Sequence, residues 1–235
     1  MINLQPISKS ESSSGELLLV HSIFYTIQGE GPHCGRPATF IRLSGCNLQC
    51  PLCDTEYTNG AHWYPIQQII DKVRFTRRRN VAIPLIVITG GEPFRQNIAP
   101  LVQLLLEIGD VQIETNGTLP PPIEWTDPQP GLSIVVSPKA AKIHPKIMEL
   151  ASAFKYIIKA DSVGNDGLPM KVLDHSCGPL GVARPGSIPH DRIYLQPADE
   201  QDPIYNQRNI VAAKNSCLQF GYRIQLQIHK LIGVE

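Results

Sequence analysis

The order of the secondary-structure signals constrains the fold of this chain most strongly. Short apolar runs rich in Val, Ile and Leu alternate with stretches that carry apolar residues at helical spacing. Strands are predicted at residues 17–27, 38–43, 85–89, 111–115, 132–136, 154–159, 193–196 and 223–228. Helices are predicted at 66–78, from a cap at Asn97 to about 108, at 145–152 and at 205–220. Because alternating strands and helices form mainly parallel sheets, the pattern predicts an α/β fold.

Length and local composition indicate how the chain is divided. Its 235 residues suffice for one sizeable core, and we expect a single domain over 17–235. Residues 1–16 are polar and Ser-rich and lack the apolar core of a signal peptide, so a flexible tail is expected there. The Gly- and Pro-rich stretch 162–190 shows no periodicity and is predicted to be an irregular insertion.

Charge and hydropathy argue against two classes of partner. A formal net charge of zero argues against a protein that grips nucleic acid through its phosphates, and the basic run 77–79 is typical of a solvated helix end. No apolar stretch is long enough to cross a membrane, so we expect neither a nucleic-acid nor a membrane partner. A cytoplasmic location is the expectation that follows.

Polar, Gly-rich and ionisable residues follow almost every predicted strand. They read SGCN (44–47), TGGEP (89–93), ETNG (114–117), SPK (137–139), KAD (159–161), QPAD (196–199) and QIHK (227–230). In α/β proteins the carboxyl ends of parallel strands are where active sites are built. The sequence therefore predicts an active site at that edge.

Three of the six cysteines crowd into one such loop, as Cys46, Cys50 and Cys53. Three thiolates can bind three irons of a cubane cluster and leave the fourth iron open to a small molecule. The alternative is structural zinc, whose closed sites need a fourth ligand; only Cys34 or His62 lies near enough in sequence, and no second pair is present. We interpret Cys34, Cys177 and Cys217 as ordinary thiols.

The GGEP segment at 90–93 is the second segment whose residues could bind a cofactor. Gly90 and Gly91 would let a cofactor approach the backbone closely. Glu92 could neutralise an ammonium group, and Pro93 would stiffen the turn.

Taken together, the cysteine loop and GGEP resemble the radical S-adenosylmethionine superfamily. From about residue 17 to the C-terminus, a longer series of motifs resembles the 7-carboxy-7-deazaguanine synthase family. The series is YTIQGEG (25–31), GRP (35–37), FIRLSGCN (40–47), CDT (53–55), TGGEP (89–93), ETNGT (114–118), SPK (137–139), QP (196–197) and QIHK (227–230).

This resemblance implies a modified, incomplete (β/α) barrel with mainly parallel strands. It implies a lyase of queuosine biosynthesis that converts 6-carboxytetrahydropterin to 7-carboxy-7-deazaguanine with loss of ammonia. The implied cofactors are one 4Fe–4S cluster, S-adenosylmethionine and Mg²⁺. A homodimer and a flavodoxin- or ferredoxin-type electron donor are also implied.

The same resemblance assigns residues to roles. The cluster ligands would be Cys46, Cys50 and Cys53, with Thr55 on magnesium. S-adenosylmethionine would meet Leu52, Gly91, Glu92, Ser137, Pro138, Lys139 and Gln196. The substrate would meet Ile27, Gln28, Gly29, Arg42, Thr89 and the C-terminal Glu235. The catalytic set would be Glu30, Arg42 and His229. Leu52 departs from the family, in which this residue is commonly aromatic.

Two other readings remain open at this point. A radical activating enzyme that acts on a partner protein shares the cysteine loop and GGEP, but it does not account for QGEG (28–31) or Arg42. A non-enzymatic zinc-binding module is the second. Metal analysis separates this module from both the synthase and the activating enzyme.

Overall fold

The structure is a computed structural model, and it describes residues 2–76, 83–175, 177–178 and 181–234. Its centre is a nine-stranded sheet in the order β3-β1-β2-β4-β5-β6-β7-β8-β9. The strands are β1 (Leu17–Ile27), β2 (Pro37–Leu43), β3 (His62–Pro65), β4 (Leu85–Gly90), β5 (Asp110–Thr115), β6 (Leu132–Val136), β7 (Ala153–Ile158), β8 (Ile193–Pro197) and β9 (Arg223–Ile224). Strands β2 and β4 to β9 pair in parallel, whereas β1 pairs antiparallel with both β2 and β3.

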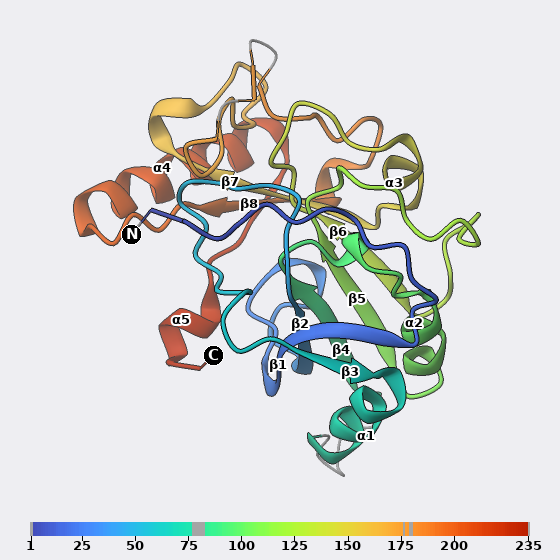
Figure 1. Ribbon diagram of the computed structural model, residues 1–235. Helices are drawn as coiled ribbons and strands as arrows, with labels where there is room; N and C mark the ends of the chain where they lie inside the picture. Colours follow the sequence, from blue (N-terminus) through green and yellow to red (C-terminus); the bar gives the residue numbers. More distant parts are fainter. Residues whose placement is uncertain (1, 77–82, 176, 179–180, 235) are drawn as a thin grey trace.

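Within the described part of the chain, five α-helices accompany the sheet. They are α1 (Ile66–Thr76), α2 (Ala99–Leu106), α3 (Pro145–Leu150), α4 (Pro203–Phe220) and α5 (Ile228–Ile232). Helix α1 packs on β1 and β3, α2 on β5, and α4 on β7 and β8. The sheet curves, but β3 and β9 form two separate edges (Figure 1). The predicted α/β fold with an open, incomplete barrel is confirmed.

The two faces of the sheet differ sharply in chemistry. The outward face is apolar and forms the core beneath the helices, with Ile41, Ile88, Ile113, Phe154 and Leu195 all buried. The neighbouring positions along the same strands face the inside of the curved sheet, where buried apolar side chains such as Leu85 and Val87 give way to polar ones at the cavity. They include Arg42, Thr89, Glu114, Lys155 and Gln196. Successive side chains of each strand point to opposite faces, so one face packs in the core and the other carries the polar residues.

Three local features differ from the sequence-based prediction. The edge strand β3 was not predicted, because a four-residue segment gives too short a pattern. Strand β9 ends at Ile224 instead of 228, because the Gln225 amide turns inward to accept a hydrogen bond from Gly31 N at 2.5 Å. Helix α2 is N-capped by Ile98; the predicted cap, Asn97, instead accepts a hydrogen bond from Ala99 N at 3.3 Å.

Within its described residues, the insertion 162–190 holds no α-helix or β-strand. Short 3-10 turns lie at its two ends. It is nevertheless part of the core, to which it contributes the buried Leu168, Val172 and Val182. Its Leu173 carbonyl accepts a hydrogen bond from Leu52 N in the cysteine loop at 3.3 Å. The insertion therefore packs both on the sheet and on that loop.

The N-terminal residues expected to form a flexible tail make specific contacts. Asn3 is only 9% exposed, and Ser8 N donates to the Cys46 carbonyl at 2.7 Å. None of the described helices is long and apolar enough to span a membrane. The basic run 77–79 lies outside the described residues.

Candidate active site

A cavity of about 530 Å³ opens inside the curved sheet. This size is typical of pockets that bind small molecules. At one end, the loop that follows β2 carries the three clustered cysteines; at the other, the segment 28–30 forms a floor. Described residues from the predicted site that line this cavity are Ile27, Gln28, Gly29, Glu30, Arg42, Cys46, Cys50, Cys53, Thr55, Thr89, Gly91, Ser137, Lys139, Gln196 and His229. Motifs scattered over 200 residues of sequence thus meet at one place.

The three thiols fit a cluster that spreads over several metal ions. Cys46, Cys50 and Cys53 all line the cavity, and burial raises the pKa of each thiol, that of Cys46 to about 12. Across the described part of the chain, no three His, Cys, Asp or Glu side chains surround one point closely enough to hold a single ion. A cubane needs a wider arrangement, because each thiolate binds a different iron. A positively charged cluster would also supply the charge that makes buried thiolates favourable.

The glycines of GGEP allow two loops to pack closely. Gly91 N donates to the Leu43 carbonyl at 3.1 Å, and Glu92 N donates to the Gly45 carbonyl at 2.9 Å. A Cβ on Gly91 would collide with the Gly45 carbonyl, and Gly90 has a positive φ of 121° beside the backbone of Leu43. These glycines therefore fix the GGEP turn against the start of the cysteine loop.

Glu92 has a different position from the one expected. It does not line the cavity, and it is completely buried. Its carboxylate accepts hydrogen bonds from Thr115 Oγ1 at 2.7 Å, from Asn116 N at 2.8 Å and from Phe94 N at 3.1 Å. Burial raises the pKa of Glu92 although these donors oppose the shift. The described contacts make Glu92 a link between the ends of β4 and β5, and its contact with S-adenosylmethionine stays a prediction.

We predict that Glu92→Gln lowers the free energy of unfolding by about 1–3 kcal/mol, because an amide nitrogen would face a donor where the carboxylate accepted one. Urea denaturation measures this change. The matched control is Glu107→Gln at an exposed position, which should leave stability unchanged. If Glu92→Gln kept wild-type stability and only weakened S-adenosylmethionine binding, the sequence-based expectation would be right instead.

Three further residues stand where the strands β6 and β8 end. Lys139 Nζ donates to the Ser137 hydroxyl at 2.8 Å, and Gln225 Nε2 donates to Gln196 Oε1 at 3.0 Å. Burial and the neighbouring Lys155 lower the pKa of Lys139. Among the described residues predicted to meet S-adenosylmethionine, Leu52, Glu92 and Pro138 do not line the cavity. Leu52 is 38% exposed, and Pro138 is buried behind its neighbours.

The floor of the cavity is built by the QGEG segment. Strand β1 runs antiparallel to β2, so its carboxyl end pairs with Pro37, at the opposite edge of the sheet from the cysteine loop. From there Gln28 turns inward, and it is only 2% exposed. Its Nε2 donates to Glu114 Oε1 at 3.0 Å, and its Oε1 accepts from Glu30 N at 3.0 Å. The predicted substrate residues of this segment therefore reach the cavity from the edge of the sheet opposite the cysteine loop.

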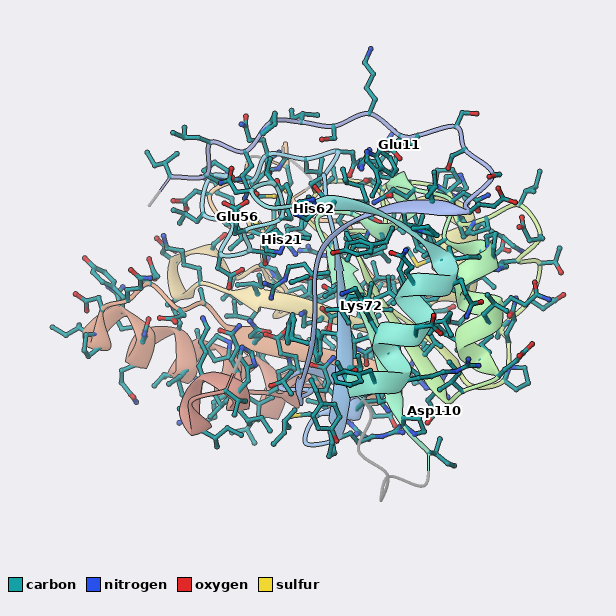
Figure 2. All side chains as sticks on the ribbon, turned by 60° about the horizontal axis from the view of Figure 1, so that its bottom comes forward. Glu11, His21, Glu56, His62, Lys72 and Asp110 are labelled. Carbon is teal, nitrogen blue, oxygen red and sulfur yellow. The ribbon has the colours of Figure 1, made fainter. Side chains whose placement is uncertain are left out.

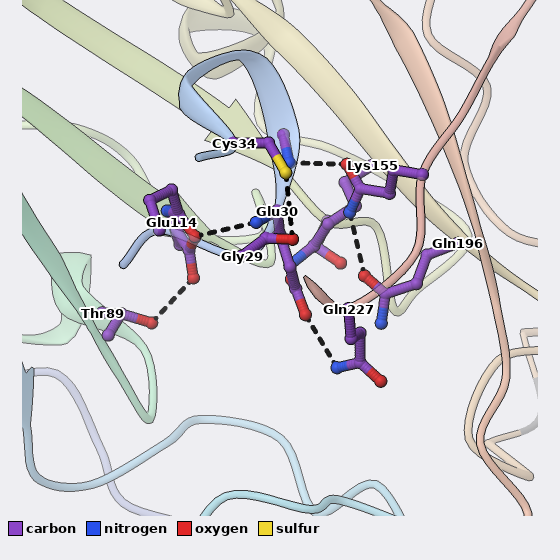
Figure 3. A network of polar contacts seen from close by, with 12 residues as sticks. Gly29, Glu30, Cys34, Thr89, Glu114, Lys155, Gln196 and Gln227 are labelled. Atoms are coloured by element: carbon purple, nitrogen blue, oxygen red, sulfur yellow. Dashed lines mark hydrogen bonds and ion pairs between the residues drawn. The ribbon is translucent and has the colours of Figure 1, made fainter. Parts of the chain in front are cut away.

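Glu30 stands at the centre of a polar network (Figure 3). Its carboxylate accepts hydrogen bonds from Lys155 Nζ and from Gln227 Nε2, the latter at 2.7 Å. Burial opposes ionisation of Glu30, but Lys155, with help from Gln227 and His229, outweighs this effect, so the pKa of the carboxyl is lowered. Burial likewise opposes the charge on Lys155, yet Glu30 and Glu114 raise its pKa. The two groups thus hold each other in the charged state.

A second carboxylate, Glu114 on β5, faces the same space. It accepts hydrogen bonds from Thr89 Oγ1 and Gln112 Nε2, both at 3.0 Å (Figure 3). Neither Glu114 nor Lys155 was assigned a role from the sequence. Lys155 is the one charged residue of strand β7, which is otherwise apolar or aromatic, and this signal could have identified it. Glu114 is the second-last residue of the mostly polar strand β5 and gives no such signal.

Arg42 and His229 complete the walls. The Arg42 guanidinium lies over the Phe24 ring, with 5.1 Å between its Cζ and the ring centroid. His229, in α5, packs against Gly29 so closely that a Cβ there would lie 2.8 Å from the imidazole Cγ. Thr55 lines the cavity beside Asp54, to which its hydroxyl donates at 3.3 Å. Glu235 lies outside the described residues.

Comparisons with known proteins agree with this site. The family model of the Radical SAM superfamily matches residues 40–127. The 7-carboxy-7-deazaguanine synthase of Rhodospirillum rubrum is 39% identical over the whole of both chains. The protein of the same name from Rickettsia prowazekii is 38% identical over 95% of this chain and 92% of the relative. The crystal structure of QueE from Escherichia coli shares the fold, with a TM-score of 0.63 at 21% identity, over 92% of this chain and 99% of that one.

Superfamily membership brings a 4Fe–4S cluster and S-adenosylmethionine, and the cysteine loop is the place where the cluster fits. Identity above 30% over the full length of a curated relative is decisive for the family. The chain therefore belongs to the 7-carboxy-7-deazaguanine synthase family of lyase-type radical S-adenosylmethionine enzymes.

Proposed function

We propose that this protein converts 6-carboxytetrahydropterin to 7-carboxy-7-deazaguanine with loss of ammonia. One observation carries the proposal beyond family membership. A single cavity combines a three-thiol loop at one end with a buried carboxylate–lysine network at the other. The three-thiol loop suits a radical-generating cluster, and the carboxylate–lysine network suits a small heterocycle with several polar edges.

The charged groups of the cavity are complementary to a carboxypterin. Its pyrimidine edge presents N–H donors in a guanidine-like arrangement, which carboxylates such as Glu30 and Glu114 accept well. Arg42 has the planar fork that binds a carboxylate through two hydrogen bonds. The Thr89 hydroxyl, now bonded to Glu114, lies within the same wall.

When bound, the cluster and S-adenosylmethionine supply a 5′-deoxyadenosyl radical, which is chemistry that no side chain provides. The residues of the chain orient the substrate and shield the cavity from water. Glu30 stays ionised through Lys155, so it can accept a hydrogen bond without first losing a proton. His229 closes the floor against Gly29 and faces the cavity, where it can hold or move a proton.

Anaerobic turnover tests the proposal directly. Reconstituted protein would be incubated with 6-carboxytetrahydropterin, S-adenosylmethionine, Mg²⁺ and dithionite, and the products analysed by mass spectrometry. We expect 7-carboxy-7-deazaguanine and ammonia in equal amounts, without matching consumption of S-adenosylmethionine, because loss of ammonia from the pterin is redox-neutral overall and the abstracted hydrogen atom must be returned. Production of 5′-deoxyadenosine only in the presence of a partner protein would instead favour a radical activating enzyme.

Magnesium is part of the proposal, with Thr55 as a ligand beside substrate oxygens. We predict that Thr55→Ala raises the Mg²⁺ concentration for half-maximal activity roughly tenfold, because a hard oxygen ligand is lost. Cluster content and S-adenosylmethionine binding should not change. Thr126→Ala is the matched control, since the Thr126 hydroxyl likewise donates to a neighbouring aspartate, Asp127, at 2.9 Å but does not line the cavity. An unaltered metal response in Thr55→Ala would exclude this ligand.

The same proposal extends to partners and location. A flavodoxin or ferredoxin would deliver the electron, and the enzyme would act as a cytoplasmic homodimer. Sedimentation and reduction assays with each type of donor test these points.

A further inference from the structure

The N-terminal segment 3–11 runs along the outside of the cysteine loop. In Figure 1 it is the dark blue chain that crosses the blue-to-cyan loop, and Figure 2 places Glu11 and the loop residue Glu56 along the same edge of the molecule. Because Asn3, Gln5 and Ser8 all bond to loop residues, the two segments are in contact over several residues. We name residues 3–11 the N-terminal strap.

Asn3 holds the middle of the loop. Its backbone N donates to the Pro51 carbonyl at 2.8 Å, and its Nδ2 donates to the Cys50 carbonyl at 3.1 Å. The side chain is only 9% exposed, whereas its neighbour Leu4 is 85% exposed. Asn3 is thus directed at the backbone of the second cysteine, and Leu4 is directed at solvent.

Gln5 holds the part of the loop that follows the third cysteine. Its Nε2 donates to the Thr55 carbonyl at 2.8 Å. Its Oε1 accepts from Tyr57 N at 2.9 Å and from Thr58 Oγ1 at 2.8 Å. One side chain therefore satisfies three loop groups that belong to neither a helix nor a strand.

The far part of the strap holds the start of the loop. Ile7 and Cys46 form a parallel β-bridge, and Ser8 N donates to the Cys46 carbonyl at 2.7 Å. Arg95, 4% exposed, donates to Glu11 Oε1 at 2.6 Å and to the Ser44 carbonyl at 2.9 Å. The strap is thereby tied to the first cysteine and to the segment that follows GGEP.

We propose that the N-terminal strap is a positioning element for the cluster ligands. The loop 44–61 contains no helix or strand among its described residues, so its own backbone does little to fix the three thiols. The strap supplies donors and acceptors at the first cysteine, at the second and after the third, and it thereby restricts the loop to one arrangement. This inference rests on the cluster that superfamily membership brings, and not on the identity of the substrate.

The test compares Asn3→Ala and Gln5→Ala with the matched control Leu4→Ala in reconstituted full-length protein. The first readout is the rate at which a ferrous chelator removes iron from the dithionite-reduced cluster. Loss of a buried hydrogen bond should accelerate this removal roughly five- to tenfold in Asn3→Ala and Gln5→Ala. The control Leu4→Ala should match the wild type, because its side chain makes no buried contact to lose.

Two further readouts separate positioning from a general loss of stability. Amide hydrogen exchange of the apoprotein should accelerate in residues 44–58 and stay unchanged in β4 and β5. The reduction potential of the cluster should rise, because a looser loop admits water that stabilises the added negative charge. Wild-type iron release and loop exchange in both variants would overturn the proposal. Equal acceleration throughout the sheet would overturn it as well, by showing only global destabilisation. None of these measurements depends on which pterin, if any, is turned over.

Discussion

The Cys50→Ala variant is expected to come out of anaerobic reconstitution without the broad absorbance of a 4Fe–4S cluster and without reductive cleavage of S-adenosylmethionine. Cys50 is buried, lines the cavity and lies between the other two thiols in the loop. With two thiolates left, a cubane would expose a second iron, and such clusters are held poorly. Because the radical originates from the cofactors, turnover should fall by at least about a thousandfold. Iron and sulfide analysis and 5′-deoxyadenosine formation measure both effects.

Cys217→Ala is the control for this experiment. Cys217 is a free thiol in α4, far along the chain from the loop and not part of the cavity lining. Its replacement should leave iron, sulfide and turnover at wild-type levels. If Cys50→Ala kept a full complement of iron and sulfide, the assignment of the cluster to this loop would be wrong.

The sequence was sufficient to predict most strands and the edge at which the cysteines lie. Parallel strands that are buried on both faces give continuous apolar runs, such as 85–89, and these are easy to recognise. The carboxyl-edge rule then placed Cys46, Gly91, Ser137 and Gln196 together, and all of them line one cavity. What remained hidden depends on long-range contacts, as for the early end of β9 at Ile224.

The position of QGEG shows why a motif's place in the sequence can mislead. Gln28 and Glu30 follow a strand, like the other motifs, but β1 is antiparallel to its neighbour β2. Their strand end therefore lies at the opposite edge, and they reach the cavity from its floor. The family resemblance gave these residues without the direction from which they enter the cavity.

Glu92 and Lys155 are residues whose partners the neighbouring sequence does not indicate. A carboxylate in a Gly-rich turn reads as a ligand for a cation, yet Glu92 is bound by Thr115 and two backbone amides. Lys155, by contrast, lies within the apolar strand β7, and nothing local indicates a partner. Its role follows only from Glu30, which is 125 positions away in the sequence.

Removing that partner is the second large change that we predict. Lys155→Met should destabilise the folded protein by about 3–5 kcal/mol at neutral pH, because Glu30 would remain buried without its counter-charge. Lys159→Met is the matched control. Lys159 pairs with Glu200 at 3.0 Å at a half-exposed position, and loss of such a pair costs less than about 1 kcal/mol.

The pH dependence identifies Glu30 as the cause. In the wild type the folded-state pKa of Glu30 lies below its ordinary value, so its contribution to stability is present above the ordinary pKa and is lost as pH falls through the lowered one. Without Lys155, burial should raise the folded-state pKa of Glu30 above the ordinary value, which reverses the sign. The variant would then lose stability as pH rises, and the difference between the two proteins should shrink under acidic conditions.

Urea denaturation of both proteins across this pH range measures the effect, and the double variant Glu30→Gln/Lys155→Met completes the design. A neutral amide at position 30 carries no buried charge, so the double variant should recover much of the stability that Lys155→Met loses. Activity should not recover with it, because the carboxylate that we propose faces the substrate is gone. If the stability deficit of Lys155→Met were the same at every pH, the loss of the ion pair with Glu30 would not be the cause of that deficit.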